Sequence, residues 1–216
     1  MSRQIGLFGG SFNPIHNGHL HLVRAVKRAL KLDGVVLMPA GEAPHKSTAE
    51  YAPAEHRLEI CRLAAENYPW MTVSDYEIRK NGKSYTVETL RALHAQHPDI
   101  HWTLMIGSDM LLTFDKWYCW QEILSLADVC AVSREKGDLP ELTDKAKQLR
   151  AAAPGANITV LRTAAFPASS TEIREKLRRG ADCAGLLPEN ALDYIAEKHL
   201  YLTEQECENS GQGGAE

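Results

Sequence analysis

Two histidines three residues apart, His16 and His19, lie in a glycine-rich segment, residues 9–19, that reads GGSFNPIHNGH. Glycine lets the backbone approach a phosphate group closely, and the start of a helix offers unpaired N–H groups to an anion. Side chains three residues apart near a helix start can point to the same side. The segment therefore predicts phosphate-binding chemistry at the start of a helix.

Other interpretations of this segment stay open. It matches neither G-x-x-x-x-G-K-[ST] nor G-x-G-x-x-G, the two common phosphate-binding patterns. His16 and His19 could form part of a metal site, although a third ligand at a sensible spacing is missing, or they could be ordinary surface side chains. The glycine pair before them and Gly18 between them favour phosphate binding.

A second motif, SSTEIR at residues 169–174, follows the last apolar run of the chain. Ser169 and Glu172 have the spacing of a capping box, and Gly180 can close the helix that follows. The serines could therefore do no more than begin a helix. Three hydroxyl side chains and Arg174 on one turn also suit a phosphate clamp, because the guanidinium fork matches phosphate oxygens.

Short apolar runs alternate with helical patterns along the chain, which predicts an α/β fold with a doubly wound parallel sheet. We expect helices over residues 19–31, 54–66 and 86–95. In such a sheet, ligands bind at the carboxyl ends of the strands, where the strand order reverses. Residues 1–202 form one predicted domain, with a long loop at 40–53. The expected strands cover residues 4–8, 34–38, 71–74, 102–106, 129–132 and 158–161.

The net charge of the chain is −4. Residues 203–216 carry four glutamates and no basic residue, so the rest of the chain is neutral. We expect this tail to be disordered. The neutral remainder argues against sequence-independent nucleic-acid binding, which needs a clustered basic surface.

Five cysteines without a C-x-x-C pair indicate free thiols in a reducing compartment. No apolar run approaches the roughly 20 residues of a membrane helix. A cytoplasmic protein without a membrane or nucleic-acid partner is expected.

Taken together, the GGSFNPxHxGH and SSTxIR motifs resemble those of the HxGH nucleotidyltransferase superfamily, and within it the bacterial nicotinate-mononucleotide adenylyltransferases. Relatives of the HxGH half also occur in pantetheine-phosphate adenylyltransferases, cytidylyltransferases and class I aminoacyl-tRNA synthetases. Three intervening motifs are similar to the nicotinate branch: PHK at 44–46, SYT at 84–86, and GSDML at 107–111 with aromatic residues after it. The resemblance extends from about residue 4 to 201. It departs at residues 40–43, where the family more often has an asparagine and a second proline, and at Ala168, where isoleucine is usual.

Each intervening motif has a simpler interpretation as well. His45 and Lys46 could be solvated loop residues, and Ser84 or Asp109 could cap a helix. The aromatic residues 114, 117 and 120, spaced by three, could form a core stripe. Their joint occurrence after successive predicted strands favours the functional interpretation.

The resemblance implies transfer of AMP from ATP to nicotinate mononucleotide, which gives nicotinate adenine dinucleotide and pyrophosphate. It implies three catalytic residues, His16, His19 and Arg174, and Mg²⁺ carried with ATP. A homo-oligomer is possible. The implied ATP-binding residues are Gly9, Gly10, Ser11, Phe12, His16, His19, Gly107, Asp109, Arg134, Ser170, Thr171 and Arg174. The implied contacts to the mononucleotide are His45, Lys46, Ser84, Thr86, Trp117 and Tyr118.

Three alternatives remain at this stage. The chain could be another small nucleotidyltransferase, above all a pantetheine-phosphate adenylyltransferase. It could be a nucleotide-binding regulator that has kept the site without turnover, or a metal-binding protein.

Overall fold

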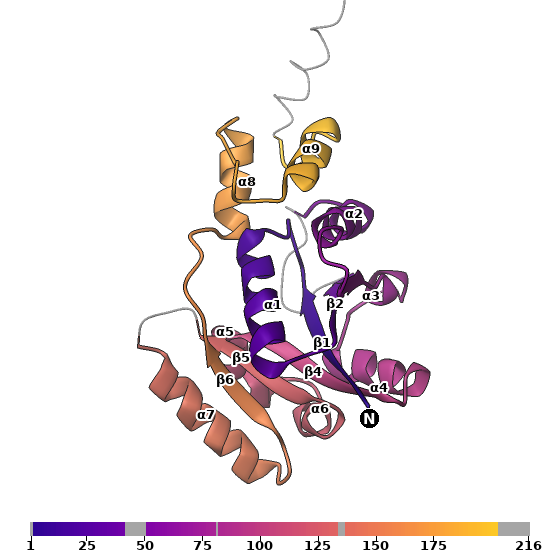
Figure 1. The fold of residues 1–216 in the computed structure, drawn as a ribbon, viewed down its shortest axis with the longest axis vertical. Helices are drawn as coiled ribbons and strands as arrows, with labels where there is room; N and C mark the ends of the chain where they lie inside the picture. The colour runs from indigo at the N-terminus through magenta and orange to yellow at the C-terminus, as the bar shows by residue number, and fades with distance from the viewer. Residues whose placement is uncertain (1, 42–50, 81, 134–136, 203–216) are drawn as a thin grey trace, which may run out of the picture.

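The computed structural model describes residues 2–41, 51–80, 82–133 and 137–202. A six-stranded sheet with the order β3-β2-β1-β4-β5-β6 forms its centre, and all neighbouring strands run parallel (Figure 1). The strands are β1 (Arg3–Gly10), β2 (Gly34–Pro39), β3 (Met71–Val73), β4 (Ile100–Gly107), β5 (Asp128–Ser133) and β6 (Ile158–Arg162). The predicted doubly wound parallel sheet is confirmed.

Helices connect the strands and cover the sheet. Those in the first half are α1 (Asn17–Leu30), α2 (Ala54–Ala65), α3 (Tyr76–Arg79) and α4 (Thr86–Gln96). They are followed by α5 (Ser108–Leu112), the 3-10 helix η1 (Phe114–Lys116), α6 (Trp120–Leu126), α7 (Leu139–Ala152), α8 (Ser170–Arg178) and α9 (Glu189–Glu197). The six predicted strands and the predicted α1, α2 and α4 are confirmed, with ends that differ by at most two residues.

Two apolar clusters fill the space between the sheet and its helices. Neighbouring residues of one strand face opposite clusters: Met105 packs with α1 and α2, whereas Leu104 and Ile106 pack with α4, α6 and α7. A strand that is buried on both faces needs a nearly continuous apolar run, and the burial pattern of β4 shows one.

Helices α8 and α9 lie beyond the carboxyl end of β1, and α9 packs beside α2 (Figure 1). His56 Nδ1 of α2 and the Tyr194 hydroxyl of α9 are 2.8 Å apart. The C-terminal helices of the described chain therefore lie at the edge of the sheet where a ligand is expected.

The described cysteines, Cys61, Cys119, Cys130 and Cys183, are free thiols, as predicted. Burial raises the pKa of the Cys130 thiol to about 12, so little thiolate exists there at neutral pH.

Candidate active site

The site lies where the strand order reverses. Gly10 and Gly107 end the neighbouring parallel strands β1 and β4, and the chain leaves them in different directions. After β1 it turns through residues 11–16 into α1, and after β4 it enters α5 at once. Crevices of this kind at the carboxyl edge of a doubly wound sheet hold nucleotides.

His16 caps α1 from inside the protein. Its side chain is 3 % exposed, and its Nδ1 accepts a hydrogen bond from the Gly18 amide at 3.1 Å. A Cβ at position 18 would lie 2.9 Å from the imidazole ring of His16, so glycine is required there for the ring to pack on the helix. Gly18 therefore makes room for the His16 ring and need not contact a ligand itself.

His19 completes the cap. Its Nδ1 accepts a hydrogen bond from the His16 amide at 3.2 Å, and the two ring centroids are 3.8 Å apart. Because both Nδ1 atoms accept from backbone amides, each ring in its neutral form carries its proton on Nε2. Two adjacent Nε2–H donors suit phosphate oxygens. The first turn of α1 also contains no acidic residue that would repel an anion.

The turn between β1 and α1 contains one residue in the left-handed region, and it is not a glycine. Phe12 has φ 44° and is 3 % exposed, and its ring is perpendicular to that of His19 at a centroid distance of 5.4 Å. A Cβ on Gly10 would lie 3.0 Å from the Phe12 ring, whereas one on Gly9 would make only ordinary contacts. Gly10 is therefore the glycine that this turn needs for its own packing.

Helix α8 brings the second motif onto this turn. The Ser170 hydroxyl donates to the Pro14 carbonyl at 3.0 Å, and Arg174 Nη1 donates to the Asn13 carbonyl at 2.9 Å. The structure thus joins two motifs that lie about 160 residues apart in the sequence. Thr171 is exposed on the same turn of α8.

The predicted capping box of α8 is confirmed. The Glu172 amide donates to Ser169 Oγ at 3.2 Å, and the Ser169 amide donates to the Glu172 carboxylate at 2.9 Å. Gly180 has φ 60° just after the helix ends. Ser169 is thus a structural residue, whereas Ser170 and Arg174 contact the turn between β1 and α1.

The β4 side of the site holds Gly107 and Asp109. Gly107 is the N-cap of α5, and Asp109 is exposed in its first turn. The alternative that Asp109 is an N-cap is therefore wrong. Arg134, which follows β5, lies outside the described residues.

The aromatic residues 114, 117 and 120 after α5 all pack against the same apolar cluster, as the core alternative expects, but they do not belong to one helix. Phe114 is fully buried in η1, Trp117 follows as the C-cap of η1, and Trp120 begins α6. The half-buried Trp117 ring stacks on Phe114 with centroids 5.0 Å apart and planes inclined by 29°. A buried ring thus supports a partly exposed indole, a surface on which a planar ligand can stack.

The SYT motif lies beside this indole platform. Tyr85 is the N-cap of α4 and makes no side-chain capping bond, so Ser84, which is buried, does not cap the helix. The rings of Tyr85 and Tyr118 are 5.1 Å apart. This contact brings the start of α4, at Thr86, to the segment that carries Trp117. His45 and Lys46 lie outside the described residues.

Two buried charged residues lie near the site and were not among the residues predicted from the motifs. Arg57 of α2 is 2 % exposed, and Glu77 of α3 is 8 % exposed. Arg57 lies on the buried stripe that continues through Ile60, Cys61 and Ala64, and an arginine in such a stripe is the signal that could have revealed it. Glu77 occurs in a four-residue helix, which has no usable periodicity.

Glu77 makes stability depend on pH in a predictable direction. Burial raises the pKa of its carboxyl group above the ordinary 4.5, and a hydrogen bond from Thr89 Oγ1 at 2.7 Å opposes only part of that rise. The folded protein therefore holds this proton more tightly than the unfolded chain.

We expect that the free energy of unfolding of the wild type, relative to Glu77→Gln, falls as the pH rises from about 4.5 through the raised pKa. Glutamine keeps an acceptor for Thr89 and cannot ionise, so it removes this dependence. Urea unfolding of both proteins between pH 4.5 and 8 measures the difference. A difference that is constant over that range would contradict the assignment.

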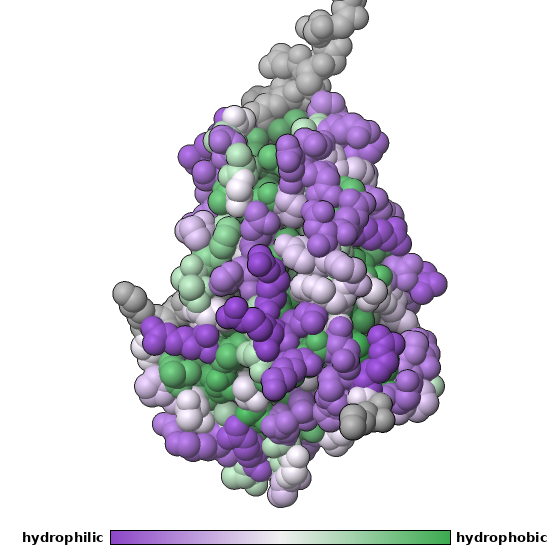
Figure 2. Space-filling model, in the orientation of Figure 1, coloured by the Kyte–Doolittle hydropathy of each residue, from purple (hydrophilic) through white to green (hydrophobic). Residues whose placement is uncertain are grey.

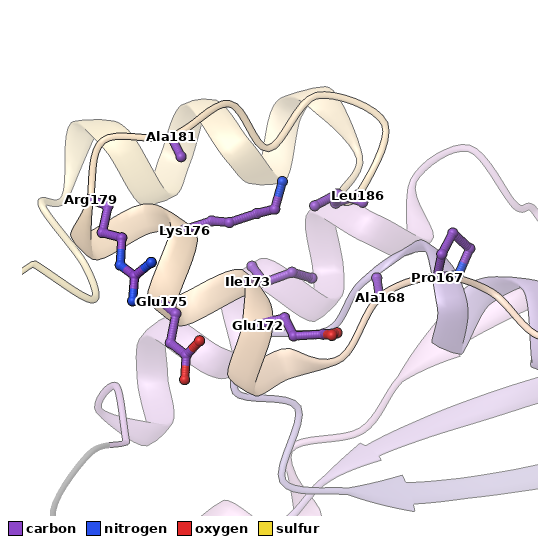
Figure 3. A pocket seen from close by; sticks show the side chains of 9 residues that line it. All are labelled: Pro167, Ala168, Glu172, Ile173, Glu175, Lys176, Arg179, Ala181 and Leu186. Atoms are coloured by element: carbon purple, nitrogen blue, oxygen red, sulfur yellow. The ribbon is translucent and has the colours of Figure 1, made fainter.

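A separate pocket of about 340 Å³ lies on another face of α8 (Figure 3). It is lined by Pro167, Ala168, Glu172, Ile173, Glu175, Lys176, Arg179, Ala181 and Leu186. None of these residues belongs to the predicted site. Ala168, where isoleucine is usual in the family that the motifs resemble, contributes a small side chain to its wall.

Hydrophilic and hydrophobic side chains are interspersed on the face that carries α1 (Figure 2). Among the described helices, none combines the length and the hydrophobicity needed to cross a membrane. The described part of the chain also holds no group of three or more His, Cys, Asp or Glu side chains that could bind a metal ion.

Comparison with known proteins identifies the class first. The cytidylyltransferase-like family model matches residues 7–176, and the chain is therefore a cytidylyltransferase-like protein. A relative from Bordetella petrii is 38 % identical over 199 residues, which cover 92 % of this chain and 99 % of the relative. One from Albidiferax ferrireducens is 37 % identical over 208 residues, which cover 93 % and 99 %. Both are named probable nicotinate-nucleotide adenylyltransferase. The chain belongs to the nicotinate-nucleotide adenylyltransferase family, as its motifs predicted.

Solved structures share the fold at low sequence identity. The Plasmodium falciparum nicotinic acid mononucleotide adenylyltransferase complexed with NaAD has a TM-score of 0.74 and 17 % identity, and the match covers 92 % of this chain and 97 % of that one. A putative nicotinate-nucleotide adenylyltransferase from Vibrio parahaemolyticus has a TM-score of 0.63 and 18 % identity, with 92 % and 95 % covered.

Proposed function

We propose that this protein transfers AMP from ATP to nicotinate mononucleotide and releases pyrophosphate. The observation that carries the proposal is the contact of α8 with the turn after β1. There Ser170 and Arg174 donate hydrogen bonds to the Pro14 and Asn13 carbonyls, next to the paired histidines. The family relationship supports the choice of substrates.

In the proposed reaction, a phosphate oxygen of the mononucleotide attacks the α-phosphorus of ATP. The new P–O bond forms as the bond from the α-phosphorus to the bridging oxygen breaks, and the electron pair leaves with pyrophosphate. The attacking phosphate is ionised at neutral pH, so no general base is needed. Catalysis then depends on holding the two phosphates in line and on stabilising the charge of the leaving group.

The described residues suit these two tasks. The Nε2–H groups of His16 and His19 would donate to the triphosphate, and the Arg174 guanidinium would hold it from α8. The backbone of the turn at Gly10 and the end of β4 at Gly107 would receive the rest of ATP. Mg²⁺ would arrive with ATP, since this ion is commonly held by substrate phosphates.

The second substrate would lie on the other side of the crevice. The pyridine ring would stack on Trp117, whose indole is supported by Phe114. The start of α4 at Thr86 would meet the carboxylate of the ring, because the N-terminus of a helix favours a negative group. Contacts of His45 and Lys46 with the mononucleotide, a cytoplasmic location and a homo-oligomeric state stay predictions.

A coupled assay of pyrophosphate release tests the proposal. The purified protein would receive MgATP with nicotinate mononucleotide, nicotinamide mononucleotide or pantetheine phosphate in parallel. We expect the highest kcat/KM with nicotinate mononucleotide. Highest turnover of pantetheine phosphate would move the protein to another branch of the superfamily, and ATP binding without turnover of any substrate would indicate a regulator.

A further inference from the structure

Arg57 is a buried cation whose hydrogen bonds connect three separate segments of the site. It is in the first turn of α2 and is 2 % exposed. Nε donates to the Ala52 carbonyl at 3.1 Å, and Nη1 donates to the Ser11 carbonyl at 2.6 Å. Nη2 donates to the carbonyls of Ala40 at 2.8 Å and Gly41 at 3.2 Å. One side chain thus connects the turn after β1, the residues after β2 and the residues before α2.

Neighbouring contacts reinforce this connection. The Ala52 amide donates to Asn13 Oδ1 at 3.0 Å, and the Tyr51 hydroxyl donates to Ser11 Oγ at 3.3 Å. The turn of residues 11–14 is therefore held by the α2 side, whereas α8 holds it through the carbonyls of Asn13 and Pro14.

The bond to Ser11 determines how the next amide is oriented. A trans peptide is planar, so a Ser11 carbonyl that points at Arg57 turns the Phe12 N–H to the opposite side. Phe12 has φ 44°, a conformation that costs a non-glycine residue free energy and persists only where its surroundings enforce it. Arg57 supplies the hydrogen bond that holds the peptide immediately before this residue.

We propose that Arg57 is a positioning residue for adenylyl transfer. It fixes the turn at Ser11 and Phe12 relative to the end of β2, and so sets the alignment of the ATP phosphates with the second substrate. This inference rests on the proposed function. Its chemical basis is that in-line transfer depends on alignment, and a displacement of about 1 Å can cost about 10²-fold in rate.

The test compares Arg57→Met and Arg57→Lys with two controls. Arg150→Met removes another arginine that donates to a backbone carbonyl, that of Ile158 at the amino end of β6. Leu149→Ala removes a core side chain, 2 % exposed, on α7 and serves as a control for loss of stability. Each variant is studied at temperatures where circular dichroism shows it to be folded. The melting temperature, kcat and both KM values are measured, together with the affinity for an unreactive ATP analogue.

We expect Arg57→Met to lower kcat by about 10- to 100-fold and to weaken analogue binding. Arg57→Lys should recover only part of kcat, because a single ammonium cannot reproduce the planar guanidinium fork. It also serves as the second variant if Arg57→Met does not fold. Arg150→Met and Leu149→Ala should keep kcat within about two-fold of the wild type, since neither residue lies near the crevice.

A folded Arg57→Met or Arg57→Lys with wild-type kcat would overturn the inference. An equal loss of kcat in Leu149→Ala at a matched loss of melting temperature would also overturn it, because the effect would then follow from stability alone. Failure of the wild type to turn over any substrate would contradict the proposed function instead. Analogue binding would still show whether Arg57 positions the turn of residues 11–14.

Discussion

Replacing His19 with alanine is expected to lower kcat by about 10²–10³-fold while the protein stays folded, because it removes a preorganised donor to the developing charge of pyrophosphate. The Nδ1 atom of His19 is occupied by the His16 amide, so the ring is oriented before ATP arrives. The substitution also removes half of a capping box. We therefore expect a loss of stability of about 1 kcal/mol as well.

A second substitution separates the two roles of His19. Glutamate is a usual residue at this position of a capping box, so His19→Glu should recover the stability that alanine loses. Its negative charge would repel the triphosphate, and kcat should stay at or below that of His19→Ala. His21→Ala, two residues further along α1, is the matched control and should keep wild-type kcat. Near-normal kcat of His19→Ala at saturating substrate would show that the assigned role is wrong.

The second large effect concerns the choice between acid and amide. Nicotinate mononucleotide should exceed nicotinamide mononucleotide in kcat/KM by roughly 10- to 10⁴-fold. No arginine occurs in residues 84–86 or 107–118 to pair with the carboxylate. Backbone N–H groups near Thr86 and Tyr118 would instead donate hydrogen bonds to the carboxylate. The NH₂ group of an amide is itself a donor and could not accept them. Such a mismatch leaves buried polar groups unpaired, at about 1–3 kcal/mol for each group.

The structure provides the geometry for this choice. The contact of Tyr85 with Tyr118 brings the start of α4 to the segment that carries Trp117. The N-cap of α4 makes no side-chain hydrogen bond to the first turn of the helix. A carboxylate can therefore take the place that a capping side chain usually fills.

Two variants test whether the backbone makes the distinction. Trp117→Ala should raise KM for both nucleotides with an almost unchanged acid-to-amide ratio, because both rings stack alike. Arg91→Ala should also keep the ratio, since this arginine of α4 is held by the Glu122 carboxylate at 2.5 and 2.6 Å. Equal kcat/KM for the two substrates in the wild type would reject the nicotinate assignment. A ratio that disappears in Arg91→Ala would assign the choice to a guanidinium instead.

Local patterns were enough to predict the positions of the strands, of α1 and of α8 from the sequence. Strands that are buried on both faces require apolar runs, and these runs predicted each strand to within two residues. The capping box of Ser169 and Glu172 spans three residues, so its geometry follows from spacing alone. Helix α7 also has an apolar stripe with helical spacing, at Leu142, Ala146 and Leu149, but no helix was predicted there.

The aromatic spacing after β4 shows where local patterns fail. Residues 114, 117 and 120 have helical spacing, yet Cys119 has φ 52° and separates η1 from α6. Periodicity assumes a continuous helix, and nothing nearby in the sequence signals this break. The stacking of Trp117 on Phe114 therefore came only from the folded chain.

Tertiary structure alone decided the contacts that organise the site. An arginine is usually exposed, so the burial of Arg57 could not be expected from its residue type. The carbonyls that it binds lie 5 to 46 residues away, and α8 binds the turn after β1 from more than 150 residues away. These contacts form because the carboxyl ends of parallel strands lie at one edge of the sheet, so loops far apart in the sequence meet there. Residue spacing within a motif indicates which residues would contact a ligand. Which residues hold those loops in place depends on the packing of the whole chain.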